Sequence, residues 1–154
     1  IEFIGVGKYR FKVAVNYDLT VEDAVKAGKY DWVNSDINSS NFSTKRSGKA
    51  EIVVELTHFN RPISTDEVLR ELDRMGYRPA ELHEFLAFGE KHPDVQREFS
   101  VIALGSRWRS PYGSLRVPGL WSRSDSRSLN LGRFDSRWDD HYRFVAVRKQ
   151  HSES

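Results

Sequence analysis

The sequence contains no cysteine, which excludes disulfide bonds, thiolate metal sites and cysteine nucleophiles. It also lacks any run approaching the roughly 18 apolar residues that a membrane-spanning helix requires. No signal-peptide pattern of a charged segment followed by an apolar one opens the chain. We therefore expect no membrane insertion, and we take the cytoplasm as the default compartment.

A second absence divides the chain. The 50 residues between Glu98 and Lys149 contain no Lys, Glu, Gln or Met, whereas residues 1–104 contain 19 residues of these four types. At that frequency about nine would be expected in 50 residues, so the C-terminal third has a composition of its own. Residues 1–104 carry 14 basic and 17 acidic side chains, and residues 105–154 carry 10 and 5.

Nine of those last ten basic residues are arginines, and three of the four tryptophans (Trp108, Trp121 and Trp138) lie in the same region. Arginine forms planar, bidentate and stacking contacts and is enriched at interface hot spots, whereas lysine is the usual solvated cation. The composition of the C-terminal third therefore indicates a polar recognition surface that aromatic residues anchor.

Length and periodicity predict one α+β domain. The 154 residues suffice for a single core. Helices are predicted where a capping-box pair, or in one case Pro79, precedes apolar residues at helical spacing. Strands are predicted where β-branched or alternating runs occur. The predicted helices cover 20–28, 64–76 and 79–89, and the predicted strands cover 10–15, 50–59, 99–104, 115–117, 127–131 and 143–147. A loop is expected at 30–47, a turn at 110–113 and a frayed tail at 150–154.

Two motifs carry a resemblance to a known family. The first is GYRPAEL at residues 76–82, and the second is LWSRS at residues 120–124, followed by a short apolar strand, a polar loop and RFVAVR at residues 143–148. These motifs resemble the segment that opens a helix, the Trp-Ser-Ser segment and the closing strand in C-type-lectin-fold domains of bacteria and phages. Among those domains are the variable proteins of diversity-generating retroelements.

The resemblance implies a fold, a domain plan and a function. It implies a C-type-lectin-like fold in which two helices accompany small antiparallel sheets, with a long, loop-rich C-terminal region as the binding face. Residues 50–149 would form the core of a single domain spanning 1–149, and residues 1–49 would be an N-terminal addition. The implied function is non-enzymatic ligand binding through a diversified surface, with a protein or other macromolecule as the ligand.

A retroelement origin has a consequence for composition. Adenine-directed mutagenesis of Asn codons cannot yield Lys, Glu, Gln, Met or Trp. From Ser122 to Val147, every residue except Trp138 belongs to the set that it can yield. The resemblance therefore implies that Trp138 is a fixed scaffold residue within a variable region.

The candidate ligand-binding residues share polar chemistry and lie between the LWSRS motif and the closing strand. They are Ser122, Arg123, Ser124, Asp125, Ser126, Ser128, Asn130, Arg133, Asp135, Ser136, Arg137, Asp139, Asp140, His141 and Tyr142. Period-two spacing turns Leu129 and Leu131 inward, and Trp138 is expected to be buried as an anchor. We expect the polar side chains from Ser122 to Tyr142 to form one contiguous exposed face.

Other interpretations remain open at this point. The Arg/Ser-rich tract at residues 122–128 is also typical of an ordinary solvated loop. The arginines could instead contact phosphates in a nucleic-acid-associated accessory protein, although Asp125, Asp135, Asp139 and Asp140 interrupt the positive charge. An enzyme with an unfamiliar site is the third alternative. We expect no metal, because adjacent ligands such as Asp139, Asp140 and His141 usually point apart on a short segment. We expect no catalytic residues and no cofactor, because no nucleophile in a recognisable motif accompanies the histidines of the predicted helices and strands.

Overall fold

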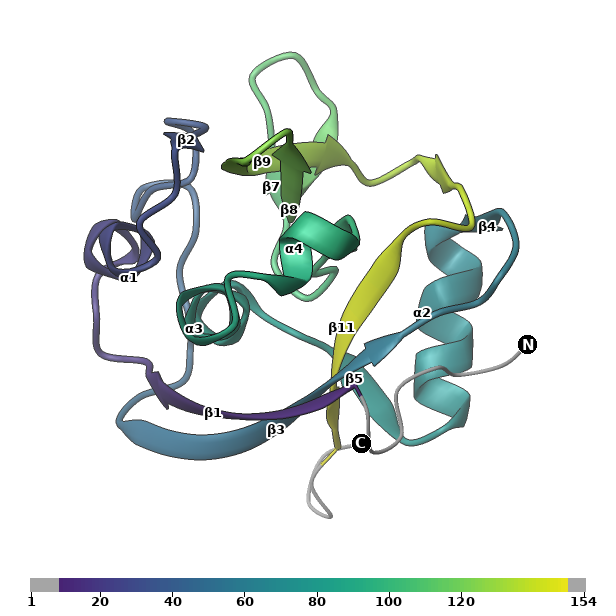
Figure 1. Ribbon diagram of the computed structural model, residues 1–154, viewed down its shortest axis with the longest axis horizontal. Coiled ribbons are helices and arrows are strands. Elements are labelled where there is room, and N and C mark those ends of the chain that lie inside the picture. The colour runs from purple at the N-terminus through teal and green to yellow at the C-terminus, as the bar shows by residue number, and fades with distance from the viewer. Residues whose placement is uncertain (1–8, 150–154) are drawn as a thin grey trace.

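The computed structural model describes residues 9–149, and within them the dominant element is a mixed sheet of nine strands (Figure 1). The strands in chain order are β1 (Arg10–Asn16), β2 (Trp32–Val33), β3 (Lys49–Thr57), β4 (Ile63–Ser64), β5 (Tyr77–Pro79), β6 (Val101–Ile102), β7 (Trp108–Arg109), β8 (Leu115–Arg123), β9 (Ser126–Arg133), β10 (Arg137–Trp138) and β11 (Arg143–Arg148). The sheet follows the order β1-β3-β11-β6-β8-β9-β2, with β5 paired to β11 and β7 to β8. β10 and β4 form a separate two-stranded sheet.

Helices account for only 22% of the described residues. They are α1 (Val21–Ala27), α2 (Thr65–Arg74), α3 (Leu82–Lys91) and α4 (Val95–Glu98). The expected fold class, an α+β C-type-lectin-like fold of two helices with small antiparallel sheets, is therefore wrong. The protein has a sheet-rich fold, and its large sheet contains both antiparallel pairs and parallel pairs, the latter between β11 and β6 and between β2 and β9.

The physical reason for this error lies in strand pairing. Short polar runs such as SRSLNLGR have weak strand propensity by themselves, so the sequence predicts only a brief strand at 127–131. In the structure β8 and β9 pair in an antiparallel ladder from Arg116↔Arg133 to Arg123↔Ser126. The backbone hydrogen bonds of this ladder hold the polar residues extended. A region expected to be loop-rich is consequently a long hairpin.

The sheet separates two apolar cores. Side chains alternate along β11, so that Val145 and Val147 face the core shared with α3 and β1, whereas Phe144 and Ala146 face the core shared with α2. Figure 1 shows α1 and α3 on one side of β11 and α2 on the other. The closing strand is therefore covered on both faces, which explains why four consecutive residues from 144 to 147 are buried.

The segment from residue 9 to residue 49 contributes to the same structure. β1 pairs with β3 over its whole length, from Arg10↔Glu55 to Asn16↔Lys49. Val13 and Val15 of β1 and Val21 of α1 belong to the same core as α3. The β1–β3 ribbon forms the outer part of the sheet (Figure 1).

Capping boxes begin α2 and α3, and the box of α2 is the one that the sequence predicts. The Ser64 hydroxyl accepts a hydrogen bond from the Glu67 amide, and the Glu67 carboxylate accepts one from the Ser64 amide, which begins α2. Glu81 and Glu84 form the equivalent box of α3. The predicted helix at 79–89 starts later than expected, because Tyr77–Pro79 pairs with β11 as β5.

Candidate functional site

Trp138 is the buried anchor of the segment that connects β9 to β11. Its side chain is 4% exposed, its indole nitrogen donates a hydrogen bond to Thr65 Oγ1 at 2.9 Å, and its ring packs edge-on against Tyr142. A Cβ atom at Gly132 would lie only 3.2 Å from the Trp138 ring, so the absence of a side chain at this position leaves room for the ring. The predicted burial of Trp138, Leu129 and Leu131 is confirmed.

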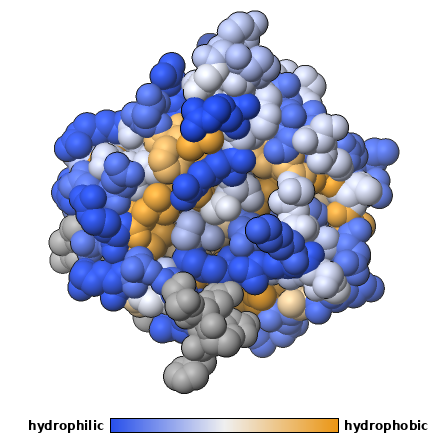
Figure 2. Space-filling model, turned by 180° about the vertical axis from the view of Figure 1, so that it is seen from behind, coloured by the Kyte–Doolittle hydropathy of each residue, from blue (hydrophilic) through white to orange (hydrophobic). Residues whose placement is uncertain are grey.

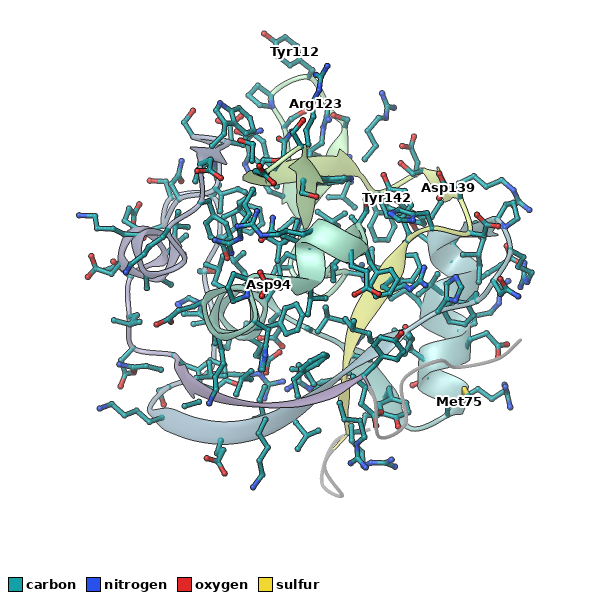
Figure 3. The ribbon with its side chains drawn as sticks, in the orientation of Figure 1. Met75, Asp94, Tyr112, Arg123, Asp139 and Tyr142 are labelled. Carbon is teal, nitrogen blue, oxygen red and sulfur yellow. The ribbon has the colours of Figure 1, made fainter. Side chains whose placement is uncertain are left out.

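Five polar side chains around this anchor are exposed, as predicted: Arg133, Asp135, Arg137, Asp139 and His141. We call residues 133–142 the polar loop. Within it Arg133 Nε lies 3.1 Å from Asp135 Oδ1, and Arg137 Nη1 lies 3.7 Å from Glu67 Oε1 of α2. Asp139 Oδ1 accepts a hydrogen bond from the His141 amide at 2.8 Å. Figure 3 shows Asp139 and Tyr142 at this edge of the molecule.

The exposed candidate residues fall into two groups. The β8–β9 register places Arg123 and Ser126 at one end of the hairpin and Arg116 and Arg133 at the other. At about 3.3 Å per residue, the two ends are roughly 20 Å apart. The end group comprises Ser122, Arg123, Ser124, Asp125 and Ser126. The fully exposed residues therefore gather at the two ends of β9, and one continuous face from Ser122 to Tyr142 stays a prediction.

Several candidate residues make contacts within the fold. The Asn130 side chain accepts a hydrogen bond from Asn34 Nδ2 at 2.9 Å, and the Tyr142 hydroxyl accepts one from the Trp121 indole at 3.2 Å. Ser128 Oγ donates to the Trp121 carbonyl at 3.4 Å. These three side chains, together with those of Ser122 and Ser136, are half-buried. These side chains therefore hold neighbouring segments together and present little area to a ligand.

Polar groups of the Asp139-Asp140-His141 segment make hydrogen bonds within the fold. Asp140 is exposed, and its backbone carbonyl lies 2.5 Å from the His58 imidazole Nε2. Among residues 9–149, no three His, Asp or Glu side chains gather closely enough to hold a metal ion. The polar groups of this segment therefore fix the shape of the polar loop.

Arg127 is the buried residue whose role the sequence analysis did not identify. It is 5% exposed, and its guanidinium donates hydrogen bonds to Gln96 Oε1 at 3.0 Å, to the Gly28 carbonyl at 2.8 Å and to the Gly89 carbonyl at 3.0 Å. It also lies over the Tyr30 ring, 4.6 Å from its centroid. The signal was present in the sequence: the period-two spacing that buries Leu129 also points Arg127 inward.

A second feature missed by the sequence analysis is a surface hollow beside the β7–β8 hairpin. We call it the hairpin hollow; its volume is about 590 Å³, and its lining is Arg109, Tyr112, Gly113, Ser114, Leu115, Arg116, Arg133, Phe134 and Asp135. The predicted turn at 110–113 is confirmed by the Gly113 amide, which donates to the Ser110 carbonyl at 2.9 Å. The hairpin projects from the molecule and carries Tyr112, which is 97% exposed (Figure 3).

Positive charge predominates in the hairpin hollow, where three arginines face one aspartate. Hydrogen bonds from Arg133, followed by the charges of Arg133 and Arg116, hold the pKa of Asp135 below its ordinary value. Arg107 lies over the Phe134 ring, 4.6 Å from its centroid, and burial lowers its pKa. Figure 2 views the molecule from behind and shows hydrophilic side chains and apolar patches below the part that projects at the top.

The polar loop and the hairpin hollow thus meet at Arg133, Phe134 and Asp135. Arg109 and Arg116 flank the predicted turn, which is a signal that the sequence offers for them. Their convergence with Arg133 depends on the strand register, which the sequence does not show. Within residues 9–149 no helix is long and apolar enough to cross a membrane. No family model, curated protein or solved structure matches this chain.

Proposed function

We propose that this protein is a non-enzymatic binding protein whose polar loop and adjoining hairpin hollow contact a protein or other macromolecular ligand. The observation that carries the proposal is the contrast around Trp138. The indole is buried and hydrogen-bonded, while the polar side chains at 133, 135, 137, 139 and 141 are exposed. These side chains can therefore contact a ligand without any change in the core.

A held surface favours binding because little conformational entropy is lost on association. The polar loop is fixed at its centre by the β10–β4 pairing and at its end by the contact between Tyr142 and the Trp121 indole. The hairpin hollow beside it adds apolar area from Leu115 and Phe134 and charge from its arginines. Arginine and tyrosine at such a surface are the residue types that contribute most to interface affinity.

We further propose that the exposed positions are diversified by a retroelement. The support is the coincidence of two properties: every residue from Ser122 to Val147 except Trp138 belongs to the set that adenine-directed mutagenesis of Asn codons can yield, and Trp138 is the buried anchor of the polar loop. Replacement of exposed residues usually changes stability by less than about 0.5 kcal/mol. Variation at the exposed positions would therefore change binding and leave the sheet intact.

The genome provides the direct test of diversification. We expect a near-identical copy of the 3′ end of the coding sequence nearby, with adenines at the variable codons, beside a gene for a reverse transcriptase. Absence of both the copy and the reverse transcriptase would refute the retroelement part of the proposal and leave the binding part to be tested separately.

A display experiment tests the binding part. In one library, Arg133, Asp135, Arg137, Asp139 and His141 are randomised together, and members are selected for binding to an immobilised protein such as lysozyme. We expect most members to fold and some to bind after selection. A control library randomises the end group at residues 122–126. Widespread unfolding in the first library, or binders arising only from the control library, would contradict the proposed surface.

The alternative of a nucleic-acid-associated protein has less support. Arg127 is buried and cannot reach a phosphate, and Arg133 and Arg137 already lie beside carboxylates. Counterion release by several free cations supplies most non-specific nucleic-acid affinity, so paired arginines contribute less.

A further inference from the structure

We propose that the hairpin hollow binds a carboxylate side chain within an acidic segment of a partner protein. This inference rests on the proposed function, because it names the chemistry of the ligand for the same surface. Its basis is a hollow of about 590 Å³ that Arg109, Arg116 and Arg133 line together with Leu115 and Phe134.

Two of the three guanidinium groups remain available to a ligand. Arg116 Nε donates to Ser114 Oγ at 3.0 Å, and Arg109 Nη1 donates to the Gly113 carbonyl at 2.8 Å. Within residues 9–149 neither arginine forms an ion pair with a carboxylate, although ten other basic side chains of that part do. The bonds to Ser114 and Gly113 orient the two arginines and leave further N–H groups for the bidentate contact that guanidinium makes with a carboxylate.

The strand register places like charges together at this point. Arg116 and Arg133 are direct cross-strand partners in the β8–β9 ladder. Like charges in this position destabilise a sheet. Asp135 offsets part of this repulsion: its carboxylate bonds directly to Arg133 and lies within the influence of the Arg116 charge, so one carboxylate faces two arginines. A carboxylate that enters the hollow would offset the remaining positive charge, so binding would relieve the repulsion between these arginines.

The hollow also offers apolar contact beside its charge. Leu115 and Phe134 are half-buried in its lining, and the Tyr112 ring stands almost entirely in solvent at its rim. Large apolar side chains are normally withdrawn from water, whereas exposed tyrosine and arginine together are enriched at interface hot spots. The segment that fits would therefore carry an aromatic or aliphatic residue next to its carboxylate.

Charge distribution favours a protein segment over a nucleic acid. Asp135 lies within the hollow, and Asp36 lines a smaller hollow that shares Arg116 and Tyr112 with it. A nucleic-acid strand carries one charge about every 3.4 Å, so a backbone crossing this surface would pass both carboxylates. A single carboxylate side chain brings one negative charge, so it meets less repulsion from these two carboxylates than a nucleic-acid strand does.

The experiment measures the affinity of the complete chain for a fluorescent peptide, Gly-Glu-Phe-Glu-Glu-Phe-Glu-Gly, by anisotropy. The matched probes are the same peptide with glutamine in place of glutamate, and a labelled oligothymidine strand. We expect saturable binding of the acidic peptide alone. Arg116→Ala and Arg109→Ala should each weaken it about tenfold or more, the effect of losing a charge-assisted hydrogen bond. Arg116→Gln serves as the second variant should Arg116→Ala fold poorly.

Arg70→Ala is the control, because Arg70 lies on α2, is exposed and does not line the hollow. Its affinity for the peptide should equal that of the unmodified chain. Absence of saturable peptide binding, equal binding of the glutamine peptide, tighter binding of oligothymidine, or unchanged affinity in the Arg109 and Arg116 variants would each overturn the inference. The display experiment also randomises Arg137, Asp139 and His141, which lie outside the lining of the hollow, so binding by the polar loop can be shown even if the hollow fails.

Discussion

Replacement of Arg127 by alanine tests most directly whether this buried side chain holds the β8–β9 hairpin against the helices. The guanidinium bonds to Gln96 of α4 and to the Gly28 and Gly89 carbonyls, which end α1 and lie within α3. Hydrogen bonds to charged groups contribute about 1.5–3 kcal/mol each, and the cost of burying the guanidinium offsets part of the sum. We expect a net loss of about 3–5 kcal/mol, since the substitution leaves three buried acceptors without a donor.

Urea denaturation followed by tryptophan fluorescence measures the loss in free energy of unfolding. In thermal unfolding, a loss of this size should lower the melting temperature by roughly 10 °C at this chain length. Arg127→Lys should recover only part of the stability, because an ammonium group cannot span acceptors on three helices as a planar guanidinium does. Arg137→Ala is the matched control on the exposed surface and should cost less than about 0.5 kcal/mol. A loss below about 1 kcal/mol for Arg127→Ala would refute the structural role assigned to this residue.

Three further predictions concern the core, the buried carboxylate and nucleic-acid affinity. Leu129→Ala and Val147→Ala should each lower the free energy of unfolding by about 2–4 kcal/mol in a denaturant titration, and Arg123→Ala by less than about 0.5; equal losses would show that the arginine is structural. Burial opposes ionisation of Glu84, but hydrogen bonds from Arg78 hold its pKa below the ordinary value. Ionised Glu84 therefore stabilises the fold fully above the unfolded pKa of about 4.3, and this stabilisation is lost as the pH falls through the folded pKa. The difference in melting temperature between the unmodified chain and Glu84→Gln should consequently shrink in acid, and a difference that does not change with pH would contradict this. Random DNA or RNA should bind weakly and without saturation at about 0.15 M salt, and a tight complex with a log–log salt slope near −0.9 per phosphate would favour the nucleic-acid alternative instead.

Much of the local structure follows from the sequence alone. The capping box of Ser64 and Glu67 and the apolar spacing after it predicted α2, because these interactions lie within one helical turn. Period-two spacing predicted burial of Leu129 and Leu131, and the indole of Trp138 was predicted to be an anchor. Exposure of the charged residues in the polar loop followed from the lack of apolar neighbours in the sequence.

Tertiary structure decided the rest, because the deciding partners are distant in the chain. The size of the sheet depends on ladders between segments such as β3 and β11, and short polar strands gain their stability only from that pairing. The same ladders separate the end group at residues 122–126 from the polar loop and bring Arg109 and Arg116 to Arg133. Arg127 can be buried because carbonyls 99 and 38 residues away accept its hydrogen bonds, and the sequence of the Arg/Ser-rich tract does not reveal these distant acceptors.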